Sequence, residues 1–135
     1  MSTLLTYSET LDSVLPADLE GFLAHWDFIP PAGTLRRILE GSSLVIIARD
    51  INTSRICGYV AALTDQVAFG YISVIEVRPE CRKQGIGTEL LNRVAERLNV
   101  YGIYLSCAPA MIPFYESAGF KQVAALAKRG LPKAS

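Results

Sequence analysis

Histidine and cysteine are scarce in this sequence of 135 residues, which has one histidine and three cysteines. Cys57, Cys81 and Cys107 are scattered, and no two of them form a CxxC pair. Zinc sites usually need four such ligands at short spacings, so we expect no metal site. Scattered cysteines in odd number are typical of reduced thiols, which favours a cytoplasmic protein.

Long apolar segments and an excess of one charge sign are also missing. Runs such as Leu44–Ala48 are far shorter than the roughly 20 residues that span a bilayer. The N-terminus lacks the basic and apolar regions of a secretory signal, so we expect no signal and no membrane association. Basic and acidic residues number 13 each, giving a formal net charge of zero. Nucleic acid is therefore not an expected partner, and any anion must be held by a local group of residues.

Half of the residues are hydrophobic and 19% are charged, which is a normal balance for a globular protein. The length predicts one domain covering residues 1–135. Hydrophobic periodicity and turn residues predict strands at 4–7, 43–48, 56–63, 69–78, 103–107 and 120–127, and helices at 16–26, 34–39, 86–99 and 110–118.

This order of elements predicts an α/β (α+β) fold. The consecutive strands between 43 and 78 read as an antiparallel meander, and the strand-helix-strand unit from 69 to 107 adds a parallel pair. We therefore expect a mixed, mostly antiparallel central sheet with helices on both faces. Ligands of such sheets tend to bind at the carboxyl ends of the strands.

A glycine-containing loop, Arg82–Thr88, joins a predicted strand directly to an amphipathic helix. The first turn of a helix has free N–H groups and a partial positive charge, and Gly85 and Gly87 let an anion come close to the backbone. Arg82 and Lys83 add positive charge. The segment can hold a phosphate or pyrophosphate, or its glycines can serve only to let the chain turn into the helix. It contains neither the P-loop pattern nor the third glycine of a dinucleotide fingerprint.

Two segments resemble signature motifs of the GNAT superfamily of N-acetyltransferases. Arg82–Gly87 is similar to Gln/Arg-x-x-Gly-x-Gly/Ala, which joins the fourth strand to the third helix in that family. Pro113–Phe120 is similar to the Phe-Tyr-Glu-x-x-Gly-Phe element further along the chain. The order of elements matches over nearly the whole chain, although the N-terminal segment matches only in pattern. The resemblance implies a GNAT fold and transfer of an acetyl group from acetyl-coenzyme A to an amine.

The resemblance also implies how acetyl-coenzyme A binds. The loop would hold the pyrophosphate, and the pantetheine arm would pair with the fourth strand where that strand splays from the fifth. One departure is Ala108-Pro109, where many members carry Asn, so one side-chain contact to the coenzyme can be missing. Small members often pair through C-terminal strands, which implies a homodimer. The implied coenzyme-binding residues are Ile75, Val77, Arg82, Lys83, Gln84, Gly85, Ile86, Gly87 and Thr88.

Acyl transfer to an amine needs a base for the amine, a donor for the oxyanion and an acid for the leaving thiolate. Tyr115 matches the family tyrosine whose hydroxyl lies near the coenzyme sulfur, and a phenol can protonate a thiolate. By resemblance, the backbone N–H of Val77 is the oxyanion donor. Glu76 is the best base candidate within its strand, because a carboxylate there is costly to bury unless it is paired or functional. It could instead pair with Arg78 or point to solvent.

Other groups remain open as contributors to the acceptor site. His25 lies on an amphipathic helix, where a lone histidine is usually structural, but it and Trp26, Asp27 and Phe28 could touch the acceptor. Cys107 could suggest a covalent intermediate, and we interpret it instead as a core residue. A water relay could also run through Tyr71, Ser73, Tyr104 and Ser106.

Three classes of function fit these features. The first is an N-acetyltransferase acting on an amine of a small molecule or a protein. The second is a GNAT fold that senses acetyl-coenzyme A without turnover. The third is an unrelated nucleotide- or phosphate-binding α/β protein, which ATP or NAD would stabilise at least as well as coenzyme A.

Overall fold

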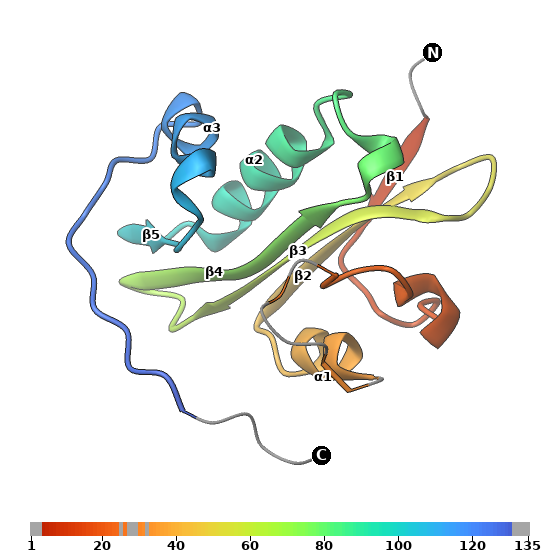
Figure 1. The fold of residues 1–135 in the computed structure, drawn as a ribbon, viewed down its shortest axis with the longest axis horizontal. Helices are drawn as coiled ribbons and strands as arrows, with labels where there is room; N and C mark the ends of the chain where they lie inside the picture. The colour runs from red at the N-terminus through yellow and green to blue at the C-terminus, as the bar shows by residue number, and fades with distance from the viewer. Residues whose placement is uncertain (1–3, 25, 27–29, 32, 131–135) are drawn as a thin grey trace.

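The computed structural model describes residues 4–24, 26, 30–31 and 33–130. One five-stranded sheet runs in the order β1-β2-β3-β4-β5, and every neighbouring pair is antiparallel except β4 and β5, which are parallel (Figure 1). The strands are β1 (Leu5–Ser8), β2 (Leu44–Asp50), β3 (Ile56–Thr64), β4 (Phe69–Val77) and β5 (Gly102–Tyr104), and the helices are α1 (Thr34–Glu40), α2 (Ile86–Leu98) and α3 (Ile112–Ser117).

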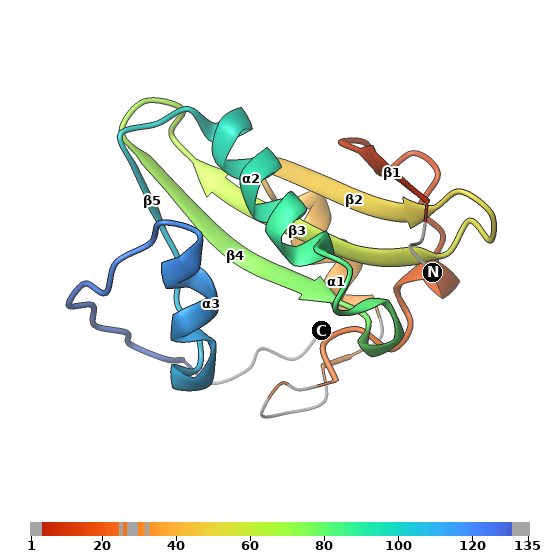
Figure 2. The same cartoon turned by 90° about the horizontal axis from the view of Figure 1, so that it is seen from above.

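Helices cover both faces of the sheet, as the sequence predicts. Helix α2 crosses one face and α1 lies on the other (Figure 2). Leu90, Leu91 and Val94 bury the apolar side of α2 against one face of β2 and β3, and Leu35 and Leu39 bury α1 against the other. Within the described residues, no helix has the length and apolar character needed to cross a membrane.

Strand β4 contains one extra residue relative to β3. Ala62 pairs with Ile72 and Ala61 pairs with Val74, so Ser73 is bulged out of the ladder. A bulge bends its strand and interrupts regular pairing. On its other side β4 pairs with β5 only from Phe69 to Tyr71, and the two strands then diverge (Figure 2). The edge of β4 after the bulge is therefore open toward β5.

The helix predicted over residues 16–26 is wrong. In the described part of this range the only helix is a short 3-10 helix, Pro16–Leu19. Gly21 and Leu23 both have positive φ, at 89° and 65°, which is incompatible with a continuing right-handed helix. The carbonyl groups of Asp18 and Glu20 accept hydrogen bonds from the Arg78 side chain rather than from amides further along a helix. A long-range contact thus overrides the local apolar spacing.

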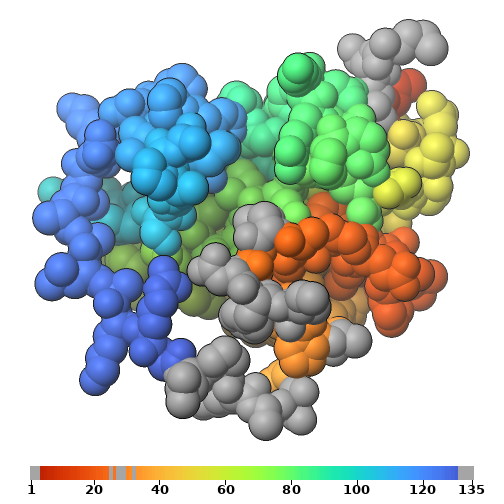
Figure 3. Space-filling model, viewed as in Figure 1, coloured from red at the N-terminus to blue at the C-terminus, as the bar shows by residue number. Residues whose placement is uncertain are grey.

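The strand predicted over residues 120–127 is also absent. Gly119, with φ 97°, turns the chain out of α3, and residues 121–130 are exposed and make no backbone hydrogen bond with the described part of the chain. Figure 3 shows this segment (blue) running along the outside of the molecule. A strand needs a partner, and β5 has only three residues at the edge of the sheet. The strand pattern in the sequence therefore finds no neighbour within these residues.

Candidate active site

A cavity of about 730 Å³ opens where β4 and β5 diverge. Residues 73–77 of β4 line one wall, and residues 105–107, which follow β5, line the other. The remaining lining residues come from β3, from the loop before α2 and the first turn of that helix, from α3 and the residues just before it, and from the segment before α1. They are Leu23, Trp26, Tyr59, Arg82, Lys83, Gly85, Ile86, Gly87, Thr88, Ala108, Met111, Phe114 and Tyr115.

The glycine loop forms the cationic end of this cavity. Lys83 and Gly85 have positive φ, at 66° and 78°, and Gly85 is the N-cap of α2. Among the described residues no side chain caps this helix end, so the first amides of α2 are available to an anion. Arg82 and Lys83 are exposed beside them, and Arg82 Nε donates to the carbonyl of Val77 at 3.2 Å. The local geometry is that of a site for phosphate groups.

Most residues predicted to bind the coenzyme line the cavity. Ile75 and Val77 are among them, as are the loop residues with the exception of Gln84, which does not belong to the lining set. The amide of Arg78 donates to the carbonyl of Cys57 on β3. Because alternate residues of an antiparallel strand bond to the same neighbour, the amides of Val77 and Ile75 point away from β3, toward the cavity. These are the groups that an extended ligand could pair with as an added strand.

Tyr115 projects into the cavity from α3. Its ring is 9% exposed and packs edge-on against Phe114 and Phe120, with centroids 5.0 and 6.0 Å away. Among the described residues its hydroxyl has no hydrogen-bond partner. Burial, and to a smaller degree the neighbouring Cys107, raises the pKa of Tyr115 above its ordinary value. The hydroxyl therefore keeps its proton at neutral pH.

Glu76 lies in the opposite wall, on β4. Its carboxylate accepts a hydrogen bond from the Tyr59 hydroxyl at 2.9 Å and from the backbone N–H of Leu23 at 3.0 and 3.3 Å. The side chain is half-buried and lines the cavity. Arg78, the partner considered from the sequence, instead donates to the carbonyl groups of three residues, Asp18, Glu20 and Ile56.

Tyr59 lines the cavity and contacts Glu76, and sequence reasoning did not identify it. It stands in an otherwise apolar strand, and a buried phenol needs a partner for its hydroxyl. The sequence therefore indicates that the Tyr59 hydroxyl needs a partner, but it does not identify Glu76 as that partner. The pairing Tyr59–Glu76 across β3 and β4 brings the two side chains to the same face.

The structure places some of the other candidate residues in the cavity and others outside it. Cys107 is exposed and lines the cavity, so its interpretation as a core residue is wrong. It follows β5, where the paired part of the strand has already ended at Tyr104. Ser73 and Ser106 line the cavity, and Ser106 Oγ is 2.9 Å from the hydroxyl of Tyr71.

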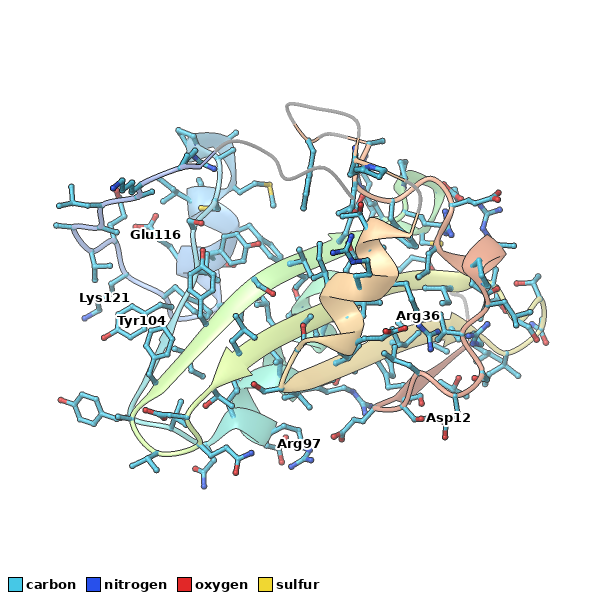
Figure 4. The ribbon with its side chains drawn as sticks, turned by 90° about the horizontal axis from the view of Figure 1, so that it is seen from below. Asp12, Arg36, Arg97, Tyr104, Glu116 and Lys121 are labelled. Atoms are coloured by element: carbon cyan, nitrogen blue, oxygen red, sulfur yellow. The ribbon has the colours of Figure 1, made fainter. Side chains whose placement is uncertain are left out.

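Tyr104 lies outside the lining set. It is 43% exposed at the β5 edge of the sheet, with its ring stacked on Phe69 at 5.5 Å (Figure 4). His25, Asp27 and Phe28 lie outside the described residues.

Comparison with known proteins agrees with this geometry. The sequence profile of the Acetyltransferase (GNAT) family matches residues 10–120. A protein from Deinococcus radiodurans R1, assigned as an acetyltransferase, is 33% identical, with a TM-score of 0.86 over 98% of this chain and 100% of that chain.

Two further solved structures share the fold at lower identity. A GNAT family acetyltransferase from Streptococcus pneumoniae TIGR4 is 18% identical, with a TM-score of 0.76 over 96% of this chain and all of that one. Glucosamine-6-phosphate N-acetyltransferase from Arabidopsis thaliana is 15% identical, with a TM-score of 0.72 over 96% of this chain and 99% of that one. The predicted fold is confirmed, and the chain belongs to the acetyltransferase (GNAT) family.

Proposed function

We propose that the protein is an acetyl-coenzyme A-dependent N-acetyltransferase that acts on a primary amine of a small molecule or protein. The proposal rests on one observation, which is that three chemical features share one cavity. The cationic end of α2, Tyr115 and Glu76 all line the same space between β4 and β5.

The loop before α2 suits the pyrophosphate of coenzyme A, because it offers free amides together with Arg82 and Lys83. The outward amides of Ile75 and Val77 suit the amide groups of the pantetheine arm. An arm that starts at the loop and pairs with Val77 and then with Ile75 runs back along β4 toward the bulge, which carries the thioester into the cavity lined by Tyr115 and Glu76. The cavity extends along β4 from the bulged residue, Ser73, to the last residue of the strand, Val77.

The proposed reaction is direct attack within a ternary complex. The amine gives a proton to Glu76 and forms a bond to the acyl carbon of acetyl-coenzyme A. A backbone N–H on the open edge of β4 that the pantetheine arm leaves unpaired stabilises the negative charge that develops on the acyl oxygen. The carbon–sulfur bond then breaks, and the leaving thiolate takes the proton of Tyr115. Glu76 and Tyr115 return to their starting states by proton exchange with solvent.

An amine acceptor agrees with the activity of one relative of the same fold, since the Arabidopsis thaliana protein is a glucosamine-6-phosphate N-acetyltransferase. At 15% identity that relative supports the class of acceptor and not its identity. Three free cysteines support the cytoplasm as the compartment.

Replacement of Gly87 by tryptophan is expected to abolish stabilisation by acetyl-coenzyme A. Gly87 lines the cavity, and a Cβ there would already lie 3.4 Å from the Phe114 ring. Ligand at 100 times its dissociation constant adds about 2.7 kcal/mol of stability, which is several degrees of melting temperature for a domain of this size. Thermal shift with acetyl-coenzyme A, coenzyme A, ATP and NAD measures the effect.

Asn92→Trp is the matched control, because Asn92 is exposed on the same helix. It should keep the full shift with acetyl-coenzyme A. Equal stabilisation of the wild type by ATP would contradict the proposal. A shift with acetyl-coenzyme A but no release of free thiol with any amine in a panel would favour the sensing module instead.

We also infer that two copies associate through the C-terminal segment 121–130. In that segment Val123 is 64% exposed and Leu126 is fully exposed, and the backbone has no partner strand within the described chain.

Leu126→Glu is expected to shift a dimer toward monomer in sedimentation equilibrium, because the substitution would bury a charge at the contact. Gln122→Glu adds the same charge at a polar position and should leave the mass unchanged. A monomeric wild type at the concentrations used for assay rules the association out.

A further inference from the structure

Tyr59 is a buried polar residue that the proposed reaction does not use directly. It is 0% exposed in the middle of β3, within the core that α1 covers, and Phe22 packs edge-on against it at 5.0 Å. Its hydroxyl donates to Glu76 Oε1 at 2.9 Å. The phenol therefore reaches from the core to the carboxylate that faces the cavity.

A second donor reaches the same carboxylate from the backbone. The N–H of Leu23 contacts both oxygens of Glu76, at 3.0 and 3.3 Å. Leu23 is 3% exposed and has φ 65°, a conformation that is strained for a residue with a branched side chain. Strain of this kind persists only where surrounding contacts hold it, and it is common at functional sites.

Arg78 supplies the contacts that hold this segment. Its guanidinium donates to the carbonyl of Asp18 and of Glu20 at 2.8 Å each, and it stacks on the ring of Phe22 at 4.1 Å. The residues just before Leu23 are thus fixed to the end of β4, and the Leu23 amide is fixed with them. The carboxylate is held between a rigid sheet residue and an anchored loop residue.

From this geometry we propose that Tyr59 is a positioning residue which, with the amide of Leu23, holds the Glu76 carboxylate in the orientation needed to accept the amine proton. The inference rests on the proposed function, in which Glu76 is the base. A glutamate side chain has several rotatable bonds, so an unheld carboxylate would sample orientations that do not face the acceptor. Misplacement of a catalytic group by about 1 Å can cost about 100-fold in rate.

The Tyr59 hydroxyl is suited to this task because it keeps the proton that it donates to the carboxylate. Burial, and then the charge of Glu76, raises the pKa of Tyr59 well above its ordinary value. The phenol therefore remains a donor over the whole working range of pH and does not itself take part in proton transfer.

The test is a double-mutant cycle with Tyr59→Phe and Glu76→Gln, assayed by release of coenzyme A thiol with the best amine of a panel. Tyr59→Phe keeps the ring in the core and is expected to lower kcat about 10-fold, with the KM of each substrate within twofold of wild type. In the Glu76→Gln background the same substitution should cause no further loss, because the base it positions is already gone. Tyr7→Phe, the same change at a half-buried tyrosine of β1, should leave kcat within twofold.

Four outcomes overturn the proposal. An unchanged kcat in Tyr59→Phe, or an equal loss with and without Glu76, leaves the N-acetyltransferase intact and removes the positioning role. A changed KM for acetyl-coenzyme A with unchanged kcat assigns Tyr59 to folding of the coenzyme site. Wild-type protein that transfers no acetyl group to any amine defeats the proposed function and this inference with it.

Discussion

Tyr115→Phe is expected to lower kcat for acetyl transfer by about 100-fold or more while leaving acetyl-coenzyme A binding unchanged. General acid catalysis contributes about 10²- to 10⁴-fold, and phenylalanine keeps the ring packing while removing the proton. Tyr115 is almost fully buried, packs against Phe114 and Phe120, and lines the cavity. Steady-state thiol release gives kcat, and thermal shift gives the affinity for the coenzyme.

The pH profile adds a second expectation for the same residue. Burial raises the pKa of Tyr115 above its ordinary value of 10, with a smaller contribution from Cys107. A raised pKa keeps the protonated form populated to higher pH, so wild-type kcat should not fall on the alkaline side below about pH 10 from loss of this proton. A fall that begins near pH 8 would assign the acid to another group.

Tyr101→Phe provides the control for Tyr115→Phe, because Tyr101 is 95% exposed and lies outside the cavity. It should match the wild type in kcat and in melting temperature. If Tyr115→Phe also keeps wild-type kcat, the thiolate receives its proton from water or leaves unprotonated. The role of Tyr115 would then be packing alone.

Arg78→Met is expected to reduce the free energy of unfolding by about 3–5 kcal/mol. The guanidinium is 7% exposed and donates to three backbone carbonyl groups, at distances of 2.6 to 2.8 Å. Each buried group that loses its partner costs about 1–3 kcal/mol, and the contact with the Phe22 ring is lost as well. Urea denaturation measures the change, and the melting temperature should fall by roughly 10 °C or more.

Arg55→Met is the matched control. Arg55 pairs with Glu80 at 2.8 Å, but both side chains are more than half exposed, so the pair contributes less than about 1 kcal/mol. A similar loss of stability in the two variants would show that the Arg78 contacts do not anchor the segment. Because Arg78 holds the residues before Leu23, its loss should also lower kcat through Glu76.

Comparison of the two loops around the site explains which predictions from sequence succeed. The loop before α2 forms as expected, because glycine and the amphipathic helix that follows are local signals over adjacent residues. The segment from Pro16 to Trp26 does not form its predicted helix, because its carbonyl groups bond to Arg78, about 60 residues away in sequence. The spacing of apolar residues indicates which side chains are buried. It does not indicate which hydrogen-bond partner each backbone carbonyl group takes.

The same distinction applies to the chemistry. The sequence identified Tyr115 and Glu76 as candidates from their motif and from a carboxylate in an apolar strand. It could not find Tyr59, because the contact with Glu76 depends on the register between β3 and β4. It also assigned Cys107 to the core, where the structure shows it exposed beyond the last paired residue of β5, and the sequence gives no sign of where that pairing stops.

The sequence by itself determined the order of elements between residues 34 and 118, the loop that suits a phosphate and the family of the chain, because these depend on patterns within short segments. Only the tertiary structure decided the opening between β4 and β5, the anchoring by Arg78 and the two donors that hold Glu76. Each of these depends on one residue of register or on a side chain that reaches a distant backbone group. Such contacts are fixed by three-dimensional packing and leave no periodic trace in the sequence.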